Sequence, residues 1–125
     1  MAPVATAAFI ALECTDPRAL AEFYAAVTGL QIVTADCHWV TLGTSDVEPR
    51  RGLLLAFQRA PGHLPPTWPD PASSMQMHLD LRTADLEAAE TEVLRLGATK
   101  LDDQPGNRFR VYADPAGHPF CLFQE

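Results

Sequence analysis

The sequence predicts an α+β domain made of two βαβββ modules, which form a curved, mostly antiparallel sheet with the helices on its outer face. Three observations predict this fold. The two halves of the chain show the same order of strand-like and helix-like segments, each half contains a helix that begins after an Asp and ends at a Gly, and a proline-rich segment separates the halves. Such an internal repeat indicates that both halves fold in the same way.

The chain has 125 residues, of which 47% are hydrophobic. This size and composition suit one domain with one core, spanning residues 1–125, and are too apolar for a disordered chain. We expect the first module at about 1–59, a connector at about 60–74 and the second module at about 75–125.

The first module is expected to begin with a strand at 9–14. Asp16 then serves as the N-cap of a helix and Pro17 as its first residue. One face of this helix is apolar, formed by Leu20, Phe23, Tyr24 and Val27. Gly29 ends the helix. Strands follow at about 30–34, 39–42 and 53–58, with a polar turn at 46–51.

The connector carries five prolines, namely Pro61, Pro65, Pro66, Pro69 and Pro71. Proline lacks a backbone N–H and fixes φ, so this stretch cannot form a helix or a central strand. We interpret it as a linker or an ordered loop between the modules. Trp68 lies within it, and its indole either pins the loop to the body of the protein or caps a cavity.

The second module repeats the pattern, with a strand at 75–81 and a helix that Asp85 caps. The apolar face of this helix consists of Leu86, Ala89, Val93 and Leu96, and Gly97 ends it. Strands are expected at about 99–101, 108–113 and 120–123, with a turn at 114–117.

The charge pattern excludes some classes of partner. The net charge is −7 and no segment gathers Lys and Arg into a basic patch, which argues against nucleic acids and anionic membranes. No secretory signal and no apolar run long enough to span a membrane are recognised, so we expect a cytoplasmic protein. Three cysteines without Cys-x-x-Cys spacing are expected to be free thiols.

Alignment of the modules defines four equivalent positions. Placing Asp16 on Asp85 puts Phe9 on His78, because both lie seven residues before the capping Asp. The module ends also align, with LAFQ at 55–58 against CLFQ at 121–124. This second alignment places Leu55 on Cys121.

Strand alternation predicts which side chains lie on the open face, the face of the sheet that the helices do not cover. Phe120 and Leu122 are expected under the helices, with Cys121 and Phe123 opposite, and Phe109 is expected in the core. The open face would carry Phe9, Glu13, Leu55, Phe57, His78, Asp80, Arg108, Arg110, Tyr112 and Cys121. Such a face suits a concave ligand site or an interface.

Three stretches carry a resemblance to a known family. They are Asp16-Pro17 with Phe23-Tyr24 and Gly29, HLDL at 78–81 with Asp85-Leu86 and LGA at 96–98, and DPAGHPFCLF at 114–123. Together they cover nearly the whole chain, which resembles the glyoxalase/bleomycin-resistance (vicinal oxygen chelate) superfamily. The resemblance implies two modules around a concave site, and a homodimer with sites near the interface.

Metal enzymes of this superfamily place His, Gln or Glu at the four equivalent positions. The resemblance would carry the ligand role onto Phe9, Leu55, His78 and Cys121, but Phe9 and Leu55 have no donor atom. Recruiting Asp80 or Glu13 instead would require a displaced geometry. We therefore predict no metal ligands and no cofactor, with a bound divalent ion as the alternative.

The candidate site combines aromatic and polar side chains. A flat ligand would stack on aromatic residues. Arg108 and Arg110 would either meet an anionic or carbonyl group of that ligand or be solvent-exposed charges of their strand. The predicted ligand-binding residues are Phe9, Trp39, Leu55, Phe57, Trp68, His78, Asp80, Arg110, Tyr112 and Cys121. Cys121 is interpreted as a small hydrophobic residue, unless Arg110 activates its thiol.

His78 is either bonded to a neighbour such as Asp80 or Tyr112 or free to bind a ligand, and it is the best candidate for a catalytic residue. The resemblance implies metal-independent binding or sequestration of a small molecule, and we expect an aromatic natural product or antibiotic. The alternative is a metal-dependent lyase, isomerase or dioxygenase. A metal-free enzyme with His78 or Asp80 as general base stays open.

Overall fold

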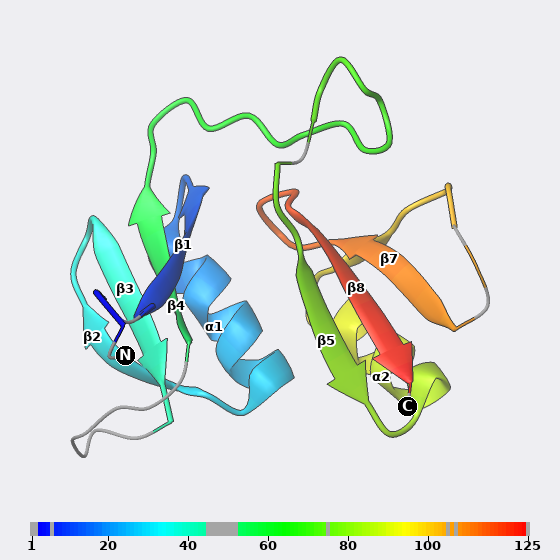
Figure 1. Cartoon of the computed structure of the whole chain (residues 1–125), viewed down its shortest axis with the longest axis horizontal. Helices are drawn as coiled ribbons and strands as arrows, with labels where there is room; N and C mark the ends of the chain where they lie inside the picture. The colour runs from blue at the N-terminus through cyan, green and yellow to red at the C-terminus, as the bar shows by residue number, and fades with distance from the viewer. Residues whose placement is uncertain are drawn as a thin grey trace. The chain divides into compact units, whose positions relative to one another are not determined.

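A computed structural model describes residues 3–5, 7–44, 53–74, 76–104, 106 and 108–124 of the chain (Figure 1). The chain divides into two compact units, Met1–His63 and Leu64–Glu125. The turn predicted at 46–51 lies outside the described residues, as does Met75 at the start of the predicted strand 75–81.

The first unit contains one complete βαβββ module. Its elements in chain order are β1 (Phe9–Cys14), α1 (Pro17–Thr28), β2 (Gln31–Ala35), β3 (Trp39–Gly43) and β4 (Leu54–Arg59). The strands form a four-stranded sheet in the order β1-β4-β3-β2, in which β1 runs parallel to β4 and the other neighbours are antiparallel. The helix α1 packs along one face of this sheet (Figure 1).

The ends of α1 follow from its sequence. The Asp16 carboxylate accepts a hydrogen bond from the Ala19 backbone N–H at 3.1 Å, which satisfies a donor that has no partner inside the helix. Gly29 ends the helix in the left-handed conformation, at φ 77°. Leu20 and Tyr24 then point into the core of the unit, where both are buried.

The second unit repeats this topology. Its elements are β5 (Leu79–Thr83), α2 (Leu86–Arg95), β6 (Thr99–Lys100), β7 (Phe109–Ala113) and β8 (Pro119–Gln124). The sheet order is β5-β8-β7-β6, and β5 runs parallel to β8. Asp85 caps α2 by accepting from the Ala88 N–H at 3.1 Å. The prediction of two βαβββ modules in an α+β fold is confirmed, with one four-stranded mixed sheet in each unit.

The register of β4 corrects the predicted face of two residues. Ile10 pairs with Leu55 and Leu12 with Phe57, so both β4 side chains share the helix-covered face with Leu12. The Phe57 ring stacks on Tyr24 of α1 at 5.7 Å between centroids and has no exposed surface. Leu55 and Phe57 therefore belong to the core of the first unit, and the prediction that they lie on the open face is wrong.

The same register moves one of the equivalent positions. Ala11 pairs with Ala56 across β1 and β4, and Asp80 pairs with Cys121 across β5 and β8. Ala11 and Asp80 each lie five residues before the Asp that caps the following helix. The counterpart of Cys121 in the first unit is therefore Ala56, one residue beyond the predicted Leu55.

The faces of β7 are the reverse of the predicted ones. Arg110 pairs with Leu122 and Tyr112 with Phe120, which places both side chains on the face that α2 covers. Phe109 pairs with Phe123 on the open face. The predictions that Arg110 and Tyr112 line the open face and that Phe109 lies in the core are wrong. Arg110 and Tyr112 lie on the helix-covered face because they make polar contacts with α2, which are described below.

In the part of the chain that the structure describes, no helix is long and apolar enough to cross a membrane.

Candidate ligand-binding site

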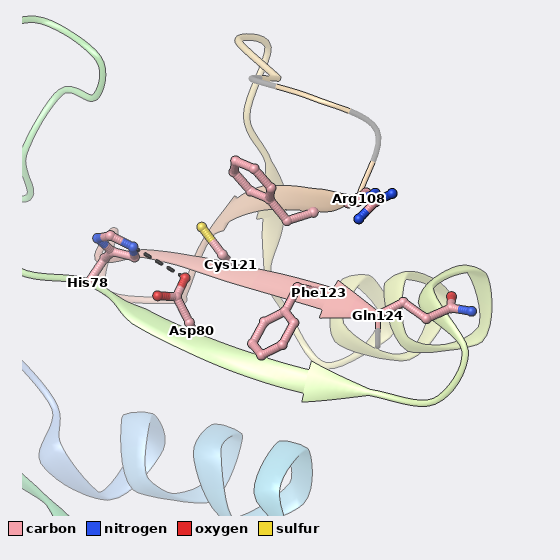
Figure 2. A pocket seen from close by; sticks show the side chains of 7 residues that line it. His78, Asp80, Arg108, Cys121, Phe123 and Gln124 are labelled. Atoms are coloured by element: carbon pink, nitrogen blue, oxygen red, sulfur yellow. Dashed lines mark ion pairs between the residues drawn. The ribbon is translucent and has the colours of Figure 1, made fainter.

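A pocket of about 680 Å³ lies on the open face of the second sheet (Figure 2). Its volume falls within the ordinary range for small-molecule sites. All its lining residues belong to the second unit, and they are His78, Asp80, Arg108, Phe109, Cys121, Phe123 and Gln124. The pocket therefore brings together three of the predicted binding residues, His78, Asp80 and Cys121.

Strand geometry explains why His78, Asp80 and Cys121 meet. Asp80 and Cys121 are paired neighbours on β5 and β8, so their side chains project from the same face. His78 precedes Asp80 by two residues, and its Nε2 lies 3.2 Å from the Asp80 Oδ1. Of the two partners considered for His78 from the sequence, the structure gives Asp80.

The Cys121 thiol is protonated at neutral pH. Burial, the largest cause, together with the negative charge of Asp80 and a hydrogen bond to that carboxylate, raises its pKa to about 11. Arg110, the residue considered as an activating charge, lies on the opposite face of the sheet. Cys121 therefore contributes a small, neutral surface to the pocket rather than a nucleophile.

Two aromatic side chains line the pocket. Phe109 and Phe123 are paired across β7 and β8, and both side chains line the pocket. Phe109 is 37% exposed, which is high for a Phe in a strand. Strand alternation predicts Phe109 on the wrong face. It predicts Phe123 on the open face beside Cys121, but the predicted binding residues do not include Phe123.

Arg108 lies at the far end of the pocket from His78 (Figure 2). It precedes β7, and its backbone carbonyl accepts from the Gln124 N–H at 3.4 Å. The Gln124 side chain has a structural task, because its Oε1 accepts from the Leu86 N–H at the start of α2 at 2.9 Å. The sequence placed Arg108 on the open face as a contact for an anionic or carbonyl group, and the structure puts it in the pocket, whereas Gln124 was not predicted there.

Arg110 and Tyr112 instead join β7 to α2. Arg110 forms ion pairs with Glu87 and Glu90, the second at 3.2 Å, and the Tyr112 hydroxyl donates to Glu90 at 2.9 Å. Lys100 of β6 also contacts Glu90 at 2.8 Å. Burial and the neighbouring Glu90 raise the pKa of Tyr112, which keeps the phenol protonated as a donor. Neither Arg110 nor Tyr112 lines the pocket.

Trp68 lies in a different cavity of the second unit, of about 240 Å³. The indole is half-buried, and the cavity wall also includes Pro65, Leu101 and Gly117. Of the two alternatives for Trp68, this position favours pinning of the connector, while the indole still borders a small hollow. Trp68 does not line the pocket around His78.

Phe9 and Trp39 form an aromatic pair within the first unit. Their rings meet edge to face at 6.4 Å between centroids. Both belong to the open face of the first sheet, because Phe9 pairs with Leu54 and Trp39 with Gln58, on the face opposite Phe57. This matches the predicted face for Phe9, and any role in binding stays a prediction.

Comparison with known families places the chain. The model of the glyoxalase-like domain matches residues 9–123, which is nearly the whole chain. The chain belongs to the glyoxalase-like domain family. No protein among the curated sequences matches it.

Solved structures show the same glyoxalase-like fold at low sequence identity. A glyoxalase/bleomycin resistance protein/dioxygenase family enzyme from Burkholderia phytofirmans PsJN is 13% identical, with 94% of this chain and 96% of that chain covered and a TM-score of 0.70. An antibiotic binding protein from Streptomyces sp. CB03234 is 17% identical, with 99% and 98% covered and a TM-score of 0.59. The bleomycin-binding protein of Streptomyces verticillus is 18% identical, with 100% and 99% covered and a TM-score of 0.57.

The residues of this glyoxalase-like domain do not fit a metal site built from the four equivalent positions. With the corrected register these are Phe9, Ala56, His78 and Cys121, and neither Phe9 nor Ala56 has a donor atom. Within the second unit, donor atoms of His78, Asp80 and Cys121 do lie within 4.8 Å of one another. This cluster offers three ligands from one module, as a catalytic zinc uses, but its thiol would first have to lose its proton.

Proposed function

We propose that this protein binds a small aromatic molecule without a metal ion, in the pocket on the open face of the second sheet. The observation that carries the proposal is the composition of that pocket. Two phenylalanine rings and a protonated thiol line it, with a carboxylate at one end and a guanidinium at the other. Few polar groups around an apolar centre are typical of sites that orient a flat ligand.

Two similar structures support this direction. The proteins from Streptomyces sp. CB03234 and Streptomyces verticillus bind an antibiotic and bleomycin respectively. At 17% and 18% identity they share the fold with this chain, and they indicate that the fold accommodates binding of natural products. Sequestration of an antibiotic or related natural product is therefore the role we propose for the pocket.

The apolar surface of the pocket is sufficient for useful affinity. A guest that buries ~300 Å² of apolar surface gains roughly 7 kcal/mol at about 25 cal/mol per Å². Association costs of ~4 kcal/mol or more are subtracted from this gain. Stacking on Phe109 and Phe123 adds about 0.5–1.5 kcal/mol per contact, which brings micromolar dissociation constants within reach.

The test is a thermal-shift screen of aromatic natural products, repeated with EDTA. We expect ligands that raise the melting temperature equally with and without the chelator, and a weaker effect in Phe109→Ala. The matched control is Leu94→Ala, which removes a similarly exposed apolar side chain from α2. If no aromatic compound stabilises the protein, or if Leu94→Ala weakens binding as much as Phe109→Ala, the proposal is wrong.

A metal-dependent lyase, isomerase or dioxygenase is the second candidate, because three donor atoms of His78, Asp80 and Cys121 lie close together. This alternative predicts stoichiometric zinc or another divalent ion in protein purified without chelator, measured by elemental analysis. The metal would be lost in His78→Ala. A metal content well below one ion per chain would remove this candidate.

We also propose that the protein is cytoplasmic and, as the family resemblance implies, a homodimer. Sedimentation velocity at micromolar concentration tests the dimer directly. A monomeric mass would remove this part of the proposal without affecting the pocket, since the described lining residues all come from one chain and one unit.

A further inference from the structure

The polar groups of the pocket lie at opposite ends of it. His78 and Asp80 occupy one end, Arg108 lies at the other, and Cys121 and Phe123 lie between them (Figure 2). We propose, on the basis of the function proposed above, that the ligand is an elongated aromatic molecule with a cationic nitrogen at one end and an anionic oxygen at the other.

The sheet register gives the separation of the two ends. Asp80 is paired with Cys121, and Arg108 is bonded through its backbone to Gln124. Cys121 and Gln124 are three residues apart on β8, which at a rise of about 3.3 Å per residue corresponds to ~10 Å. A fused aromatic ring system with one polar substituent at each end has a comparable length.

The acidic end can accept a cationic nitrogen. The Asp80 side chain is 58% exposed, and its contacts are an imidazole and a neutral thiol, while Arg82, two residues along β5, lies over the Phe123 ring at 5.8 Å. Among the residues that the structure describes, no permanently charged cation forms an ion pair with Asp80. The carboxylate therefore keeps an oxygen available for a charge-assisted hydrogen bond with an ammonium group.

The basic end can accept an anionic oxygen. No acidic side chain within the described ranges pairs with Arg108, whereas Arg110 on the other face is held by Glu87 and Glu90. A planar guanidinium with unused N–H groups suits bidentate binding of a carboxylate. The pocket thus separates charge of opposite sign across an aromatic centre, which complements an amphoteric ligand.

Four probes with one aromatic core test the inference. They are 6-(aminomethyl)-2-naphthoic acid, the matching methyl-substituted acid, the matching methyl-substituted amine and 2,6-dimethylnaphthalene, with dissociation constants measured by fluorescence titration. We expect the amphoteric probe to bind about tenfold more tightly than either singly charged probe, since charge-assisted hydrogen bonds exceed neutral ones.

Charge-neutralising variants assign each end. Arg108→Gln should abolish the gain in affinity that the carboxylate of the probe provides and preserve the gain that its amine provides. Asp80→Asn should abolish the gain from the amine and preserve the gain from the carboxylate. Arg95→Gln and Asp102→Asn, at exposed positions outside the pocket, are matched controls and should change neither of these two gains in affinity.

The two proposals fail in different ways. If all four probes bind equally and Phe109→Ala weakens them all, the amphoteric ligand is wrong while the aromatic pocket stands. If the amphoteric probe binds best but Arg108→Gln and Asp80→Asn leave its affinity unchanged, the assignment of the two ends is wrong. If no probe binds, the proposed function and the inference built on it are both wrong.

Discussion

Cys121 shows how burial and a neighbouring carboxylate together set the chemistry of a side chain. Its thiol lies beside the Asp80 carboxylate, and burial together with that negative charge raises its pKa to about 11 from an ordinary value of 9.0. Two pH units correspond to roughly a hundredfold lower thiolate fraction at neutral pH. In the same chain, Cys37 is exposed.

We therefore expect Cys121 to resist alkylation by iodoacetamide at pH 8 under native conditions, while Cys37 reacts readily. In Asp80→Asn the pKa of Cys121 should fall, because the charge of Asp80 is gone, and alkylation should accelerate. Burial, the largest cause of the shift, remains, so the recovery should be partial. Mass spectrometry of digested samples measures both sites, and equal rates at Cys37 and Cys121 would contradict the assignment.

Phe57 is a core residue, although its sequence position suggested a ligand contact. Its ring stacks on Tyr24 of α1 and is fully buried. Phe57→Ala should lower the free energy of unfolding by about 3–5 kcal/mol, because it removes buried contacts and leaves a cavity. Chemical denaturation measures this loss.

Phe9→Ala is the matched control for Phe57→Ala, because Phe9 is 40% exposed on the opposite face of the same sheet. It should cost less than about 1.5 kcal/mol. Comparable losses in the two variants would mean that Phe57 is not packed beneath α1.

At the scale of elements, the helices could be predicted closely and the strand faces only in part. Both N-caps and the Gly29 stop follow from local backbone chemistry, which needs no knowledge of the rest of the fold. The strand β4 is different. Leu54, Leu55, Ala56 and Phe57 are all buried, so its sequence has no apolar–polar alternation to show which face each residue takes.

The error in β7 has another physical origin. The sequence of β7 predicts aromatic Phe109 inside and charged Arg110 outside, which is the usual arrangement. Here the ion pairs with Glu87 and Glu90 allow Arg110 to lie under α2. A signal was present in the sequence, because two glutamates three residues apart share one face of a helix. One of the four equivalent positions, Leu55 instead of Ala56, was predicted one residue too early, because the sequence of β4 does not show its register.

Tyr112 provides a test of this polar link between β7 and α2. Its hydroxyl donates to Glu90, and Tyr112→Phe should cost about 1–2 kcal/mol at pH 7, because a hydrogen bond to a charged acceptor is lost. A hydrogen bond from Lys100, a hydrogen bond from Tyr112 and the charge of Arg110 lower the pKa of Glu90 below its ordinary value of 4.5. The Glu90 carboxylate therefore contributes its full stabilisation above pH 4.5, and this contribution is lost as the pH falls through the lower pKa that Glu90 has in the folded state.

The difference between wild type and Tyr112→Phe should consequently narrow as the pH falls below 4.5. Urea denaturation at several pH values measures it. A difference that grows on acidification would show that the hydroxyl does not depend on the Glu90 carboxylate. Ligand binding in the pocket should not change, because Tyr112 lies on the other face of the sheet.

At the scale of the whole molecule, the repeat accounts for the fold and the divergence of its halves accounts for the site. The same βαβββ topology appears in both units, yet the position of Cys121 is taken by Ala56 in the first unit, and that of Asp80 by Ala11. The polar chemistry of the pocket is thus confined to one copy. Sequence comparison of the two halves could identify this asymmetry, but only the register shows which residues correspond.

The connector is anchored on the second unit through a close approach at Gly117. A Cβ atom at that position would lie 2.3 Å from the Cβ of Pro65, and Gly117 has a φ of 93°, which L-residues rarely adopt. Gly117→Ala should therefore both strain the backbone and push Pro65 away, moving Trp68, which borders the same cavity. We expect a loss of about 1–3 kcal/mol in unfolding free energy and a red-shifted Trp68 emission.

Gly62→Ala separates the two effects, because Gly62 has a similar φ of 81° but a Cβ there would meet no atom within 4 Å. Both variants are made in a Trp39→Phe background, so that the fluorescence reports Trp68 alone. Gly62→Ala should show the cost of backbone strain with an unchanged emission maximum, and only Gly117→Ala should shift it. If the two spectra are identical, Pro65 does not pack on Gly117, and the connector owes its place on the second unit to other contacts.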